Sequence, residues 1–175
     1  MKRTLYLLII LSMFSQLCNA QKIETVEEYK VFYKSLASRL RIAEKDSSCF
    51  IGKPFSELAK HLEKCGVKIE SVGITNFDSQ KVTPQNLYGI RLLFIDNKIW
   101  NFALTNELRH PDVYVDFNEI LPYQQALSLV KEYKGNFTEE VEEFYSKATV
   151  KSLLFAIPDN LSMFPHRNKP VLINE

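Results

Sequence analysis

Hydrophobic residues recur at helical spacing over residues 25–43. Thr25-Val26-Glu27-Glu28 is a capping-box pattern, with a Thr hydroxyl at the N-cap position and a Glu side chain three residues later. The apolar positions that begin here are three or four residues apart, as on one face of a helix of about five turns. They are Val26, Tyr29, Tyr33, Leu36, Leu40 and Ala43. The polar run Asp46-Ser47-Ser48 predicts the end of this helix.

A second helix is expected to begin at Pro54, because the first turn of a helix needs no backbone donor from that residue. Its apolar side comprises Phe55, Leu58, Leu62 and Cys65. Gly66 predicts its end, since glycine readily takes the positive φ found after helix C-termini. Two further helices are predicted later in the chain, one from Pro122 to Gly135 and one capped by Thr138.

Alternating apolar residues in the middle of the chain predict strands. The first run is Tyr88, Ile90, Leu92 and Phe94, and the second is Trp100, Phe102 and Leu104. Setting Phe94 opposite Trp100 makes these runs a hairpin with Asp96-Asn97-Lys98 as its turn. Further strands are expected at residues 67–74, 113–117 and 148–157, the last in a central position because both of its faces are mostly apolar.

The order of the predicted elements indicates an α+β fold. Helices form pairs at both chain ends and hairpin-like strands lie between them. We therefore expect an antiparallel or mixed sheet of about five strands, with the paired helices covering one face. The polar residues 76–86 predict a loop, and residues 158–175, which hold three of the seven prolines, predict an irregular tail.

The first twenty residues have the order of a secretory signal peptide. Lys2 and Arg3 precede an apolar run that is too short to span a bilayer, and the segment closes on Cys18-Asn19-Ala20. Cleavage near Ala20 leaves residues 21–175, a length that suits one domain. We therefore expect an exported protein, periplasmic or secreted, with no transmembrane segment in the mature chain.

Charge and composition narrow the class of partner. Residues 1–20 hold two of the 22 basic residues and none of the 21 acidic ones, so the mature chain carries a net charge of −1. A nearly neutral surface argues against electrostatic binding of nucleic acid. With 46% hydrophobic and 25% charged residues, the composition is that of a folded globular protein.

One passage resembles known proteins. Phe50-Ile51-Gly52-Lys53-Pro54-Phe55-Ser56-Glu57-Leu58 resembles a phrase in small exported Bacteroidetes proteins of unknown function, where such a turn starts a short helix before a strand. More loosely, the Gly-led turn, short helix and meander are similar to outer-membrane assembly lipoproteins of the BamE type and to β-lactamase-inhibitor-like domains. Those families bind other molecules and are not enzymes. The resemblance therefore implies a binding role, and it implies no functional residue.

Two cysteines remain after the signal peptide, and two states are open for them. A Cys49–Cys65 disulfide would close a loop of about 17 residues and stabilise the fold by roughly 3 kcal/mol in an oxidising compartment. It requires residues 49–53 to run back along the second helix. The alternative is two separate thiols, with Cys65 in the core beside Leu58 and Leu62.

No set of reactive side chains converges in the sequence pattern, so we predict no catalytic residue, cofactor or metal site. His61 and Cys65 are four residues apart on one helix side, but the C-terminal end of a helix dipole disfavours a thiolate. His110 is expected to be a surface turn residue. Asp112 and Asp116 are expected to lie roughly 13 Å apart, which is too far for a glycosidase pair.

The polar residues of the predicted sheet form the best candidate binding face. Tyr114 lies between Asp112 and Asp116, and its side chain should point away from the side that Val113 and Val115 occupy. The predicted face comprises Arg91, Asn101, Thr105, Asp112, Tyr114 and Asp116.

These observations lead to three functional hypotheses. The leading hypothesis is a non-enzymatic exported domain that binds an unknown envelope protein or polymer through the polar sheet face or a helical flank. The second is a small periplasmic or secreted hydrolase whose site combines distant carboxylates with His61 or His110. The third is an assembly module in which Val171-Leu172-Ile173 adds to the sheet of a neighbour.

Overall fold

A computed structural model of the chain describes residues 23–75 and 86–163. The predicted signal peptide and the Val171-Leu172-Ile173 segment lie outside these ranges, as do most of the predicted loop and tail. The elements in chain order are α2 (Val26–Lys45), the 3-10 helix η2 (Ser47–Phe50), α3 (Phe55–Lys64), β1 (Ser71–Thr75), β2 (Asn86–Leu93), α4 (Asn97–Thr105), β3 (Asp112–Pro122), α5 (Tyr123–Glu132), α6 (Glu139–Ser146) and β4 (Val150–Ala156).

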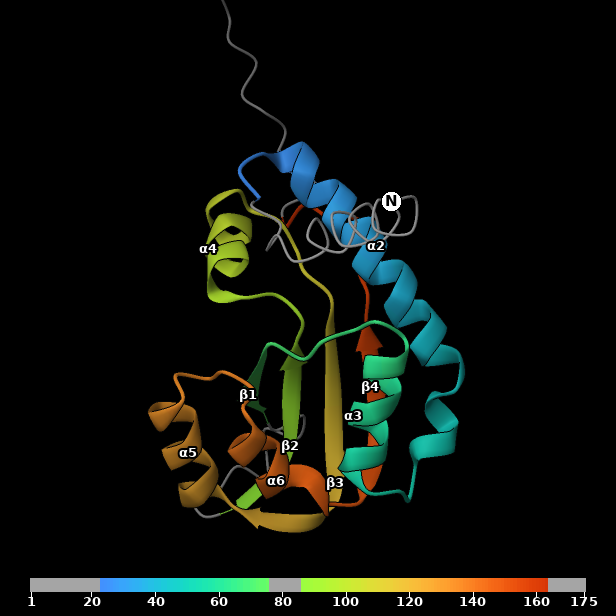
Figure 1. The fold of residues 1–175 in the computed structure, drawn as a ribbon, viewed down its shortest axis with the longest axis vertical. Helices are drawn as coiled ribbons and strands as arrows, with labels where there is room; N and C mark the ends of the chain where they lie inside the picture. Colours follow the sequence, from blue (N-terminus) through green and yellow to red (C-terminus); the bar gives the residue numbers. More distant parts are fainter. Residues whose placement is uncertain (1–22, 76–85, 164–175) are drawn as a thin grey trace, which may run out of the picture.

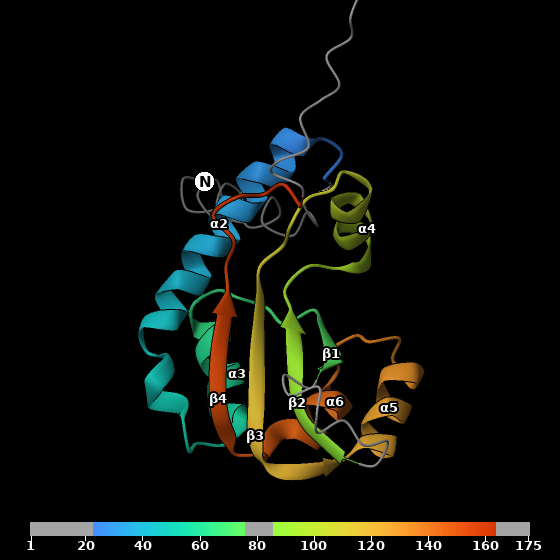
Figure 2. The ribbon, with the colours of Figure 1, turned by 180° about the vertical axis from the view of Figure 1, so that it is seen from behind.

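The strands form one antiparallel sheet in the order β1-β2-β3-β4. Helices α3 and α6 lie in front of this sheet in Figure 1, and α5 lies beside its β1 edge. The reverse view in Figure 2 shows the strands with no described helix across them. The fold is therefore α+β, as predicted, with one covered face and one face that the described helices leave open.

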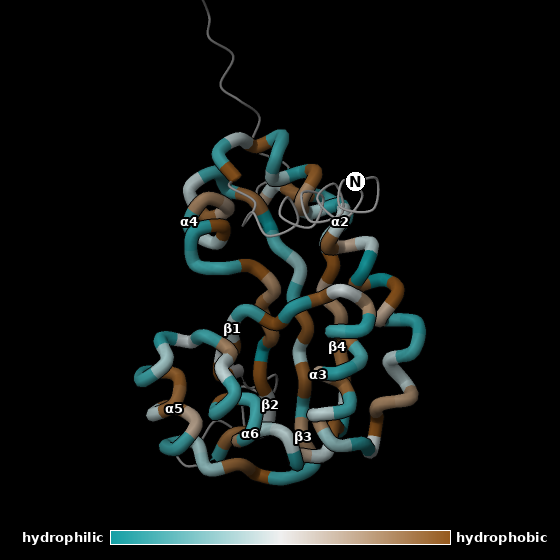
Figure 3. The backbone as a smooth tube through the Cα atoms, in the orientation of Figure 1, coloured by the Kyte–Doolittle hydropathy of each residue, from teal (hydrophilic) through white to brown (hydrophobic). Residues whose placement is uncertain are grey.

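Alternation along the strands sends apolar side chains to the covered face. Ile90 pairs with Val115 across β2 and β3, Val115 pairs with Leu153 across β3 and β4, and all three side chains lie in one core. This main core also takes in Phe55, Leu58 and Leu62 of α3, Val141 and Tyr145 of α6, and Leu36 and Leu40 of α2. Figure 3 shows hydrophobic positions along the strands.

A second, smaller group of buried side chains lies between the first half of α2 and α4. Its members are Tyr29, Tyr33, Ala37, Ala103 and Leu108, and we call it the tyrosine cluster. The Tyr29 hydroxyl donates a hydrogen bond to the carbonyl oxygen of Arg109 at 2.7 Å, and the Tyr33 hydroxyl donates to the carbonyl oxygen of Pro158. Helix α2 is thereby joined to the segments that flank β3 and β4.

The predicted helix boundaries are confirmed where a local signal sets them. Thr25 and Glu28 form the capping box at the start of α2, in which each side chain accepts from the other residue's backbone N–H. Gly66 after α3 and Gly135 after α5 both have positive φ. The Thr138 hydroxyl accepts from the backbone N–H of Val141 and caps α6.

The predicted hairpin that paired Phe94 with Trp100 is wrong, because residues 97–105 form helix α4. The Asp96 carboxylate caps this helix and accepts from the backbone N–H groups of Lys98 and Ile99, both at 2.8 Å. Ile99, Trp100 and Ala103 then face the protein interior at helical spacing. The sheet of the described chain consequently has four strands, where about five were expected.

Strand β4 is confirmed, but its predicted central position is wrong. Among the described strands it lies at one edge of the sheet and pairs with β3. Its first residue, Val150, pairs with the turn at Lys53, whose carbonyl oxygen accepts from the Val150 N–H at 2.8 Å. Leu154 on the open face is 50% exposed. One face of β4 packs against the core, and Leu154 on the other face is an exposed apolar residue. The sequence therefore looked apolar on both faces although the strand is not central.

Candidate functional site

Four of the six residues of the predicted binding face lie on the open face of the sheet. Arg91 of β2 pairs directly with Tyr114 of β3, and Asp112 and Asp116 flank Tyr114 at alternate positions. Asn101 does not belong to this surface, because it lies on α4 together with Thr105. The sequence therefore indicated the strand residues of this face correctly. Asn101 and Thr105 are not part of it, because helix α4 takes the place of the expected hairpin strand.

One row of residues crosses all four strands on the open face. In register it runs Gly73, Arg91, Tyr114, Leu154, and we call it the central row. The Arg91 guanidinium carbon lies 5.7 Å from the Tyr114 ring centroid, a cation–π distance. Leu154 stands opposite Tyr114 on the edge strand. The row thus presents an aromatic ring held by a cation beside an exposed apolar side chain.

Polar residues lie on the next row toward the far end of the sheet. The Ser152 hydroxyl donates to the Asp116 carboxylate at 2.7 Å. Gly89 occupies the β2 position of this row, and a Cβ atom there would meet the Asp116 carboxylate at 2.6 Å and the Val115 carbonyl oxygen at 2.7 Å. Asp116 therefore lies flat over β2, and this part of the open face is level.

A polar cluster lies at the other end of the open face, where β2 and β3 meet α4. It consists of Arg91, His110 and Asp112. A terminal nitrogen of Arg91 lies 2.6 Å from one oxygen of the Asp112 carboxylate, and His110 Nδ1 lies 2.7 Å from the other. Asp112 is the buried charged residue of the described chain, with 5% of its surface exposed. The Arg91 charge thus compensates the buried carboxylate, and the His110 ring lies against its other oxygen.

The prediction that His110 is a surface turn residue is wrong. Only 8% of its side chain is exposed, and its ring lies 4.4 Å from the Trp100 ring, centroid to centroid. The Arg91 guanidinium also lies against Trp100, at 5.7 Å from the ring centroid. Helix α4 therefore brings Trp100 over the polar cluster and shields it from solvent.

Three atoms of the polar cluster are buried without an aligned hydrogen bond in the described part of the chain. They are Arg91 Nε, His110 Nδ1 and Asp112 Oδ1. The short approach of His110 to Asp112 has the distance of an ion pair but not the angle of a hydrogen bond. Buried polar atoms in this state are rare in native proteins and call for a structural or functional explanation.

A cavity of about 240 Å³ opens beside these atoms. Its lining consists of Arg91, Arg109, His110, Asp112, Pro158 and Met163. The backbone of Arg109 is fixed, because its N–H donates to the Leu161 carbonyl oxygen and its own carbonyl oxygen accepts from Tyr29. Within residues 23–75 and 86–163 the Arg109 guanidinium has no ion-pair or hydrogen-bond partner.

The tyrosine cluster next to this cavity holds its phenols in the neutral form. Burial, with smaller contributions from the charges at Tyr33 and Asp112, raises the pKa of Tyr29 well above the ordinary value near 10. Burial also raises the pKa of Tyr33 to about 12. Both hydroxyls consequently remain hydrogen-bond donors to the backbone of the cavity-lining segments at neutral pH.

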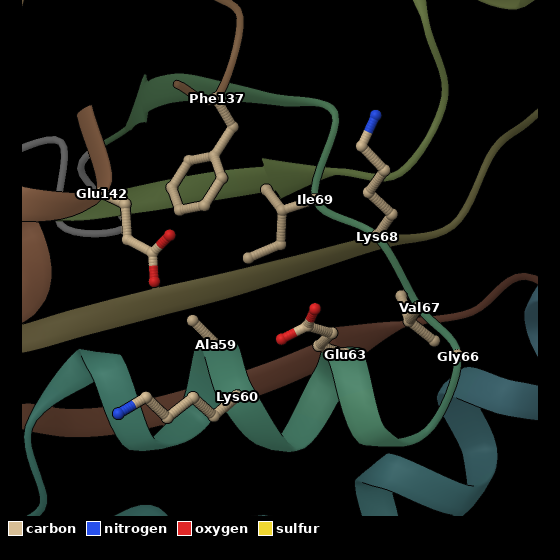
Figure 4. Close-up of a pocket in the computed structure, with 9 residues that line it drawn as sticks. All are labelled: Ala59, Lys60, Glu63, Gly66, Val67, Lys68, Ile69, Phe137 and Glu142. Atoms are coloured by element: carbon tan, nitrogen blue, oxygen red, sulfur yellow. The ribbon is translucent and has the colours of Figure 1, made fainter. Parts of the chain in front are cut away.

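A larger pocket, of about 460 Å³, lies on the helical side of the molecule between α3, α6 and the segment before β1. Figure 4 shows Phe137 and Ile69 projecting into it from one side, with Ala59 of α3 opposite. Charged residues of both signs surround this apolar floor, namely Lys60, Glu63, Lys68 and Glu142. The mixed charges give this pocket no net preference for an anion or a cation.

Cys49 and Cys65 are free thiols in the structure, Cys49 exposed on η2 and Cys65 half-buried at the end of α3. The Cys65 sulfur lies 3.7 Å from His61 Nε2, and an Asp46 oxygen lies 4.0 Å from the same nitrogen. A nucleophilic triad requires the acid and the nucleophile on different ring nitrogens. The residues therefore lie close together without the geometry of a thiol hydrolase.

Within the described ranges, no three His, Cys, Asp or Glu side chains are placed to hold a metal ion, and no helix has the length and apolar character to cross a membrane. Comparison of the chain with known protein families, with curated proteins and with solved structures finds no match. The resemblance of the turn at residues 50–58 accordingly remains an expectation.

The sequence reasoning missed Trp100 and Arg109 as part of this site. One signal was present for His110: it stands two residues before Asp112, the first residue of β3, so an extended chain there would place both side chains on the same side. Arg109 has no comparable signal, because its position depends on the segment 158–163 that packs against it.

Proposed function

We propose that this protein is an exported binding domain that contacts a protein partner through the central row of its open sheet face. The observation that supports this most directly is the exposed Leu154 beside the Arg91–Tyr114 pair. Tyr and Arg around an apolar centre are the residues that dominate protein–protein contacts. Export rests on the signal-like order of residues 1–20, and a mature mass beginning at Gln21 would test it.

Preorganisation supports the same surface. The Arg91 guanidinium is held by Asp112 and by two aromatic rings, so it loses little side-chain entropy when a partner docks. Because Arg91 already lies against the Tyr114 ring, we favour a protein partner over a sugar that would stack on that ring. An apolar side chain of the partner would cover Leu154.

The test uses the mature chain as bait in an extract of the producing cells, with bound proteins identified by mass spectrometry. Replacing Tyr114 with Ala and Leu154 with Ser together should reduce capture of the partner at least tenfold. The matched control replaces Leu104 and Ile120 with Ser, because both are exposed apolar residues away from the central row. Circular dichroism must show that each variant is folded.

A third variant separates the two candidate surfaces. Replacing Lys60 and Lys68 with Glu changes the rim of the larger pocket and leaves the open face intact. Loss of capture in this variant, with full capture by the Tyr114 and Leu154 double variant, would move the contact to the helical side. Capture of no protein above a bead control would overturn the binding role itself.

A hydrolase is the second candidate, and the His110–Asp112 contact is the observation that favours it. A histidine beside a buried carboxylate is the arrangement of a general base and its orienting acid. Turnover of ester, amide or glycoside substrates that is lost in His110→Ala and retained in His61→Ala would establish this function. Absence of turnover in the unchanged protein would dismiss it.

A further inference from the structure

We infer that the cavity beside the polar cluster binds a small carboxylate. Two arginines, Arg91 and Arg109, line this cavity together with His110, and the Arg109 guanidinium has no partner among the described residues. Arg91 Nε and His110 Nδ1 are buried beside it without aligned hydrogen bonds. The inference does not depend on the proposed protein contact, since it concerns a concave site at the end of the open face.

The charge of the lining favours an anion with a single negative charge. Arg91 and Arg109 contribute two positive charges and Asp112 contributes one negative charge, so these three side chains give the wall a net charge of plus one. A guanidinium presents parallel N–H donors that match the two oxygens of a carboxylate. A second negative charge on the ligand would be repelled by Asp112, so inorganic phosphate should bind less well.

Size and polarity define the rest of the ligand. The cavity volume of about 240 Å³ is below the usual range for drug-sized ligands, which begins at about 300 Å³. Pro158 and Met163 form the apolar part of the wall. A short hydrocarbon tail attached to the carboxylate would contact these two residues, and each buried methylene would add to the affinity.

Such a carboxylate has two sources, a free short-chain acid or the C-terminus of a polypeptide. The chemistry recognised at the cavity is the same in both cases. The two sources differ in what lies outside the cavity, because a polypeptide would continue across the rim. Butyrate and a short peptide with a free C-terminus therefore distinguish the two sources.

The experiment is a titration of the isotope-labelled mature protein followed by NMR chemical shifts of the backbone amides. Butyrate should bind with a millimolar dissociation constant and should shift amides at residues 91, 109–112 and 158–163. Butyramide, which has the same shape without the charge, should bind at least tenfold more weakly. Formate, which lacks the tail, and inorganic phosphate should also bind more weakly than butyrate.

A variant tests the role of Arg109 without touching the buried ion pair. Arg109→Gln should weaken butyrate binding at least tenfold, because the variant keeps the backbone contacts and loses the guanidinium charge, which has no partner among the described residues. Arg41→Gln is the matched control, since Arg41 pairs with Asp159 outside this cavity and should leave butyrate binding unchanged. An unchanged dissociation constant in Arg109→Gln would overturn the inference, as would equal binding of butyrate and butyramide.

A short peptide with a free C-terminus and its C-terminal amide complete the test. Tighter binding of the peptide acid than of butyrate, with loss in the amide, would support a polypeptide terminus as the source. Binding of butyrate alone would support a free acid. Failure of all carboxylates would overturn the cavity site, and it would leave the protein contact at Tyr114 and Leu154 to its own test.

Discussion

The two ends of the molecule are held together by different interactions. At one end, Phe55 makes edge-to-face contacts with Phe117 at 6.0 Å and with Tyr145 at 6.3 Å inside the main core. At the other end, the Asp112 carboxylate and the Tyr29 hydroxyl join segments that are distant in the sequence. The first end depends on close packing of apolar surface, and the second depends on pairing of buried polar groups.

This difference has a consequence for where ligands can bind. The packed apolar core excludes water, and among the described residues its one buried polar atom without a hydrogen bond is the Tyr145 hydroxyl. A buried polar cluster is stable when each donor and acceptor has a partner, and in the described part of the chain three atoms of this cluster lack one beside a cavity. The polar end is therefore the end at which we expect ligand chemistry and local opening.

Phe55→Ala should have the largest effect on stability. The side chain is fully buried, and its removal leaves a cavity between three aromatic rings, so we expect a loss of about 4 kcal/mol in the free energy of unfolding. Urea denaturation measures it. Ile51→Ala is the control, because Ile51 is close in sequence but exposed, and it should change stability by less than about 0.5 kcal/mol. Similar losses in both variants would contradict the placement of the main core.

Asp112→Ala should have the next largest effect, because it leaves the Arg91 charge without its partner. We expect a loss of about 3 kcal/mol in the free energy of unfolding. Asp116→Ala on the same strand and the same face is the control, and it should cost about 1 kcal/mol or less since its partner Ser152 is exposed. Equal effects of the two variants would show that the polar cluster is not buried.

Helices α2, α3, α5 and α6 were predictable because short local signals define them. Thr25 and Glu28 determine the start of α2 within four residues, and Gly66 and Gly135 determine chain reversals without any distant contact. The assignment of Asp112, Tyr114 and Arg91 to one face followed from strand alternation alone. These parts needed no knowledge of tertiary packing.

Helix α4 was not predictable from periodicity, because its nine residues satisfy two patterns. Trp100, Phe102 and Leu104 alternate as in a strand, while Ile99 and Ala103 are spaced as in a helix. The Asp96 cap decides in favour of the helix, but Asp is also a frequent turn residue, so this signal was ambiguous in the sequence. The burial of His110 depends on Trp100, so this single error also hid the candidate site.

Gly89→Ala tests the close approach of β3 to β2 at Gly89, in the middle of the sheet. A new Cβ atom would clash with the Val115 carbonyl oxygen at 2.7 Å, and we expect a loss of about 2 kcal/mol in the free energy of unfolding. Gly73→Ala is the matched control, because its Cβ atom would meet Arg91 at an ordinary 3.8 Å and should change stability by less than about 0.5 kcal/mol. Thermal unfolding of both variants measures the difference.

Two tyrosine substitutions compare the ends most directly, with the smallest expected effects. Tyr29→Phe removes a hydrogen bond to the Arg109 carbonyl oxygen and should cost about 1 kcal/mol in the free energy of unfolding. Tyr145→Phe removes a buried hydroxyl that has no hydrogen-bond partner within the described ranges, so it should be neutral or slightly stabilising. Denaturation at pH 7 measures both, and a loss in Tyr145→Phe as large as that in Tyr29→Phe would contradict the comparison.

Tyr29→Phe and Tyr145→Phe should differ in their effect on stability at pH 7, but both should weaken the loss of stability at high pH. Burial raises the pKa of both Tyr29 and Tyr145 above the ordinary value near 10. As pH rises above 10, the unfolded chain therefore loses phenolic protons that the folded chain retains, and the folded state becomes less stable. Each Phe variant removes one such group, so the urea midpoint should fall less between pH 9 and pH 11 in both variants than in the unchanged protein. A midpoint that falls equally in all three proteins would show that these phenols are not buried, whichever end of the molecule they belong to.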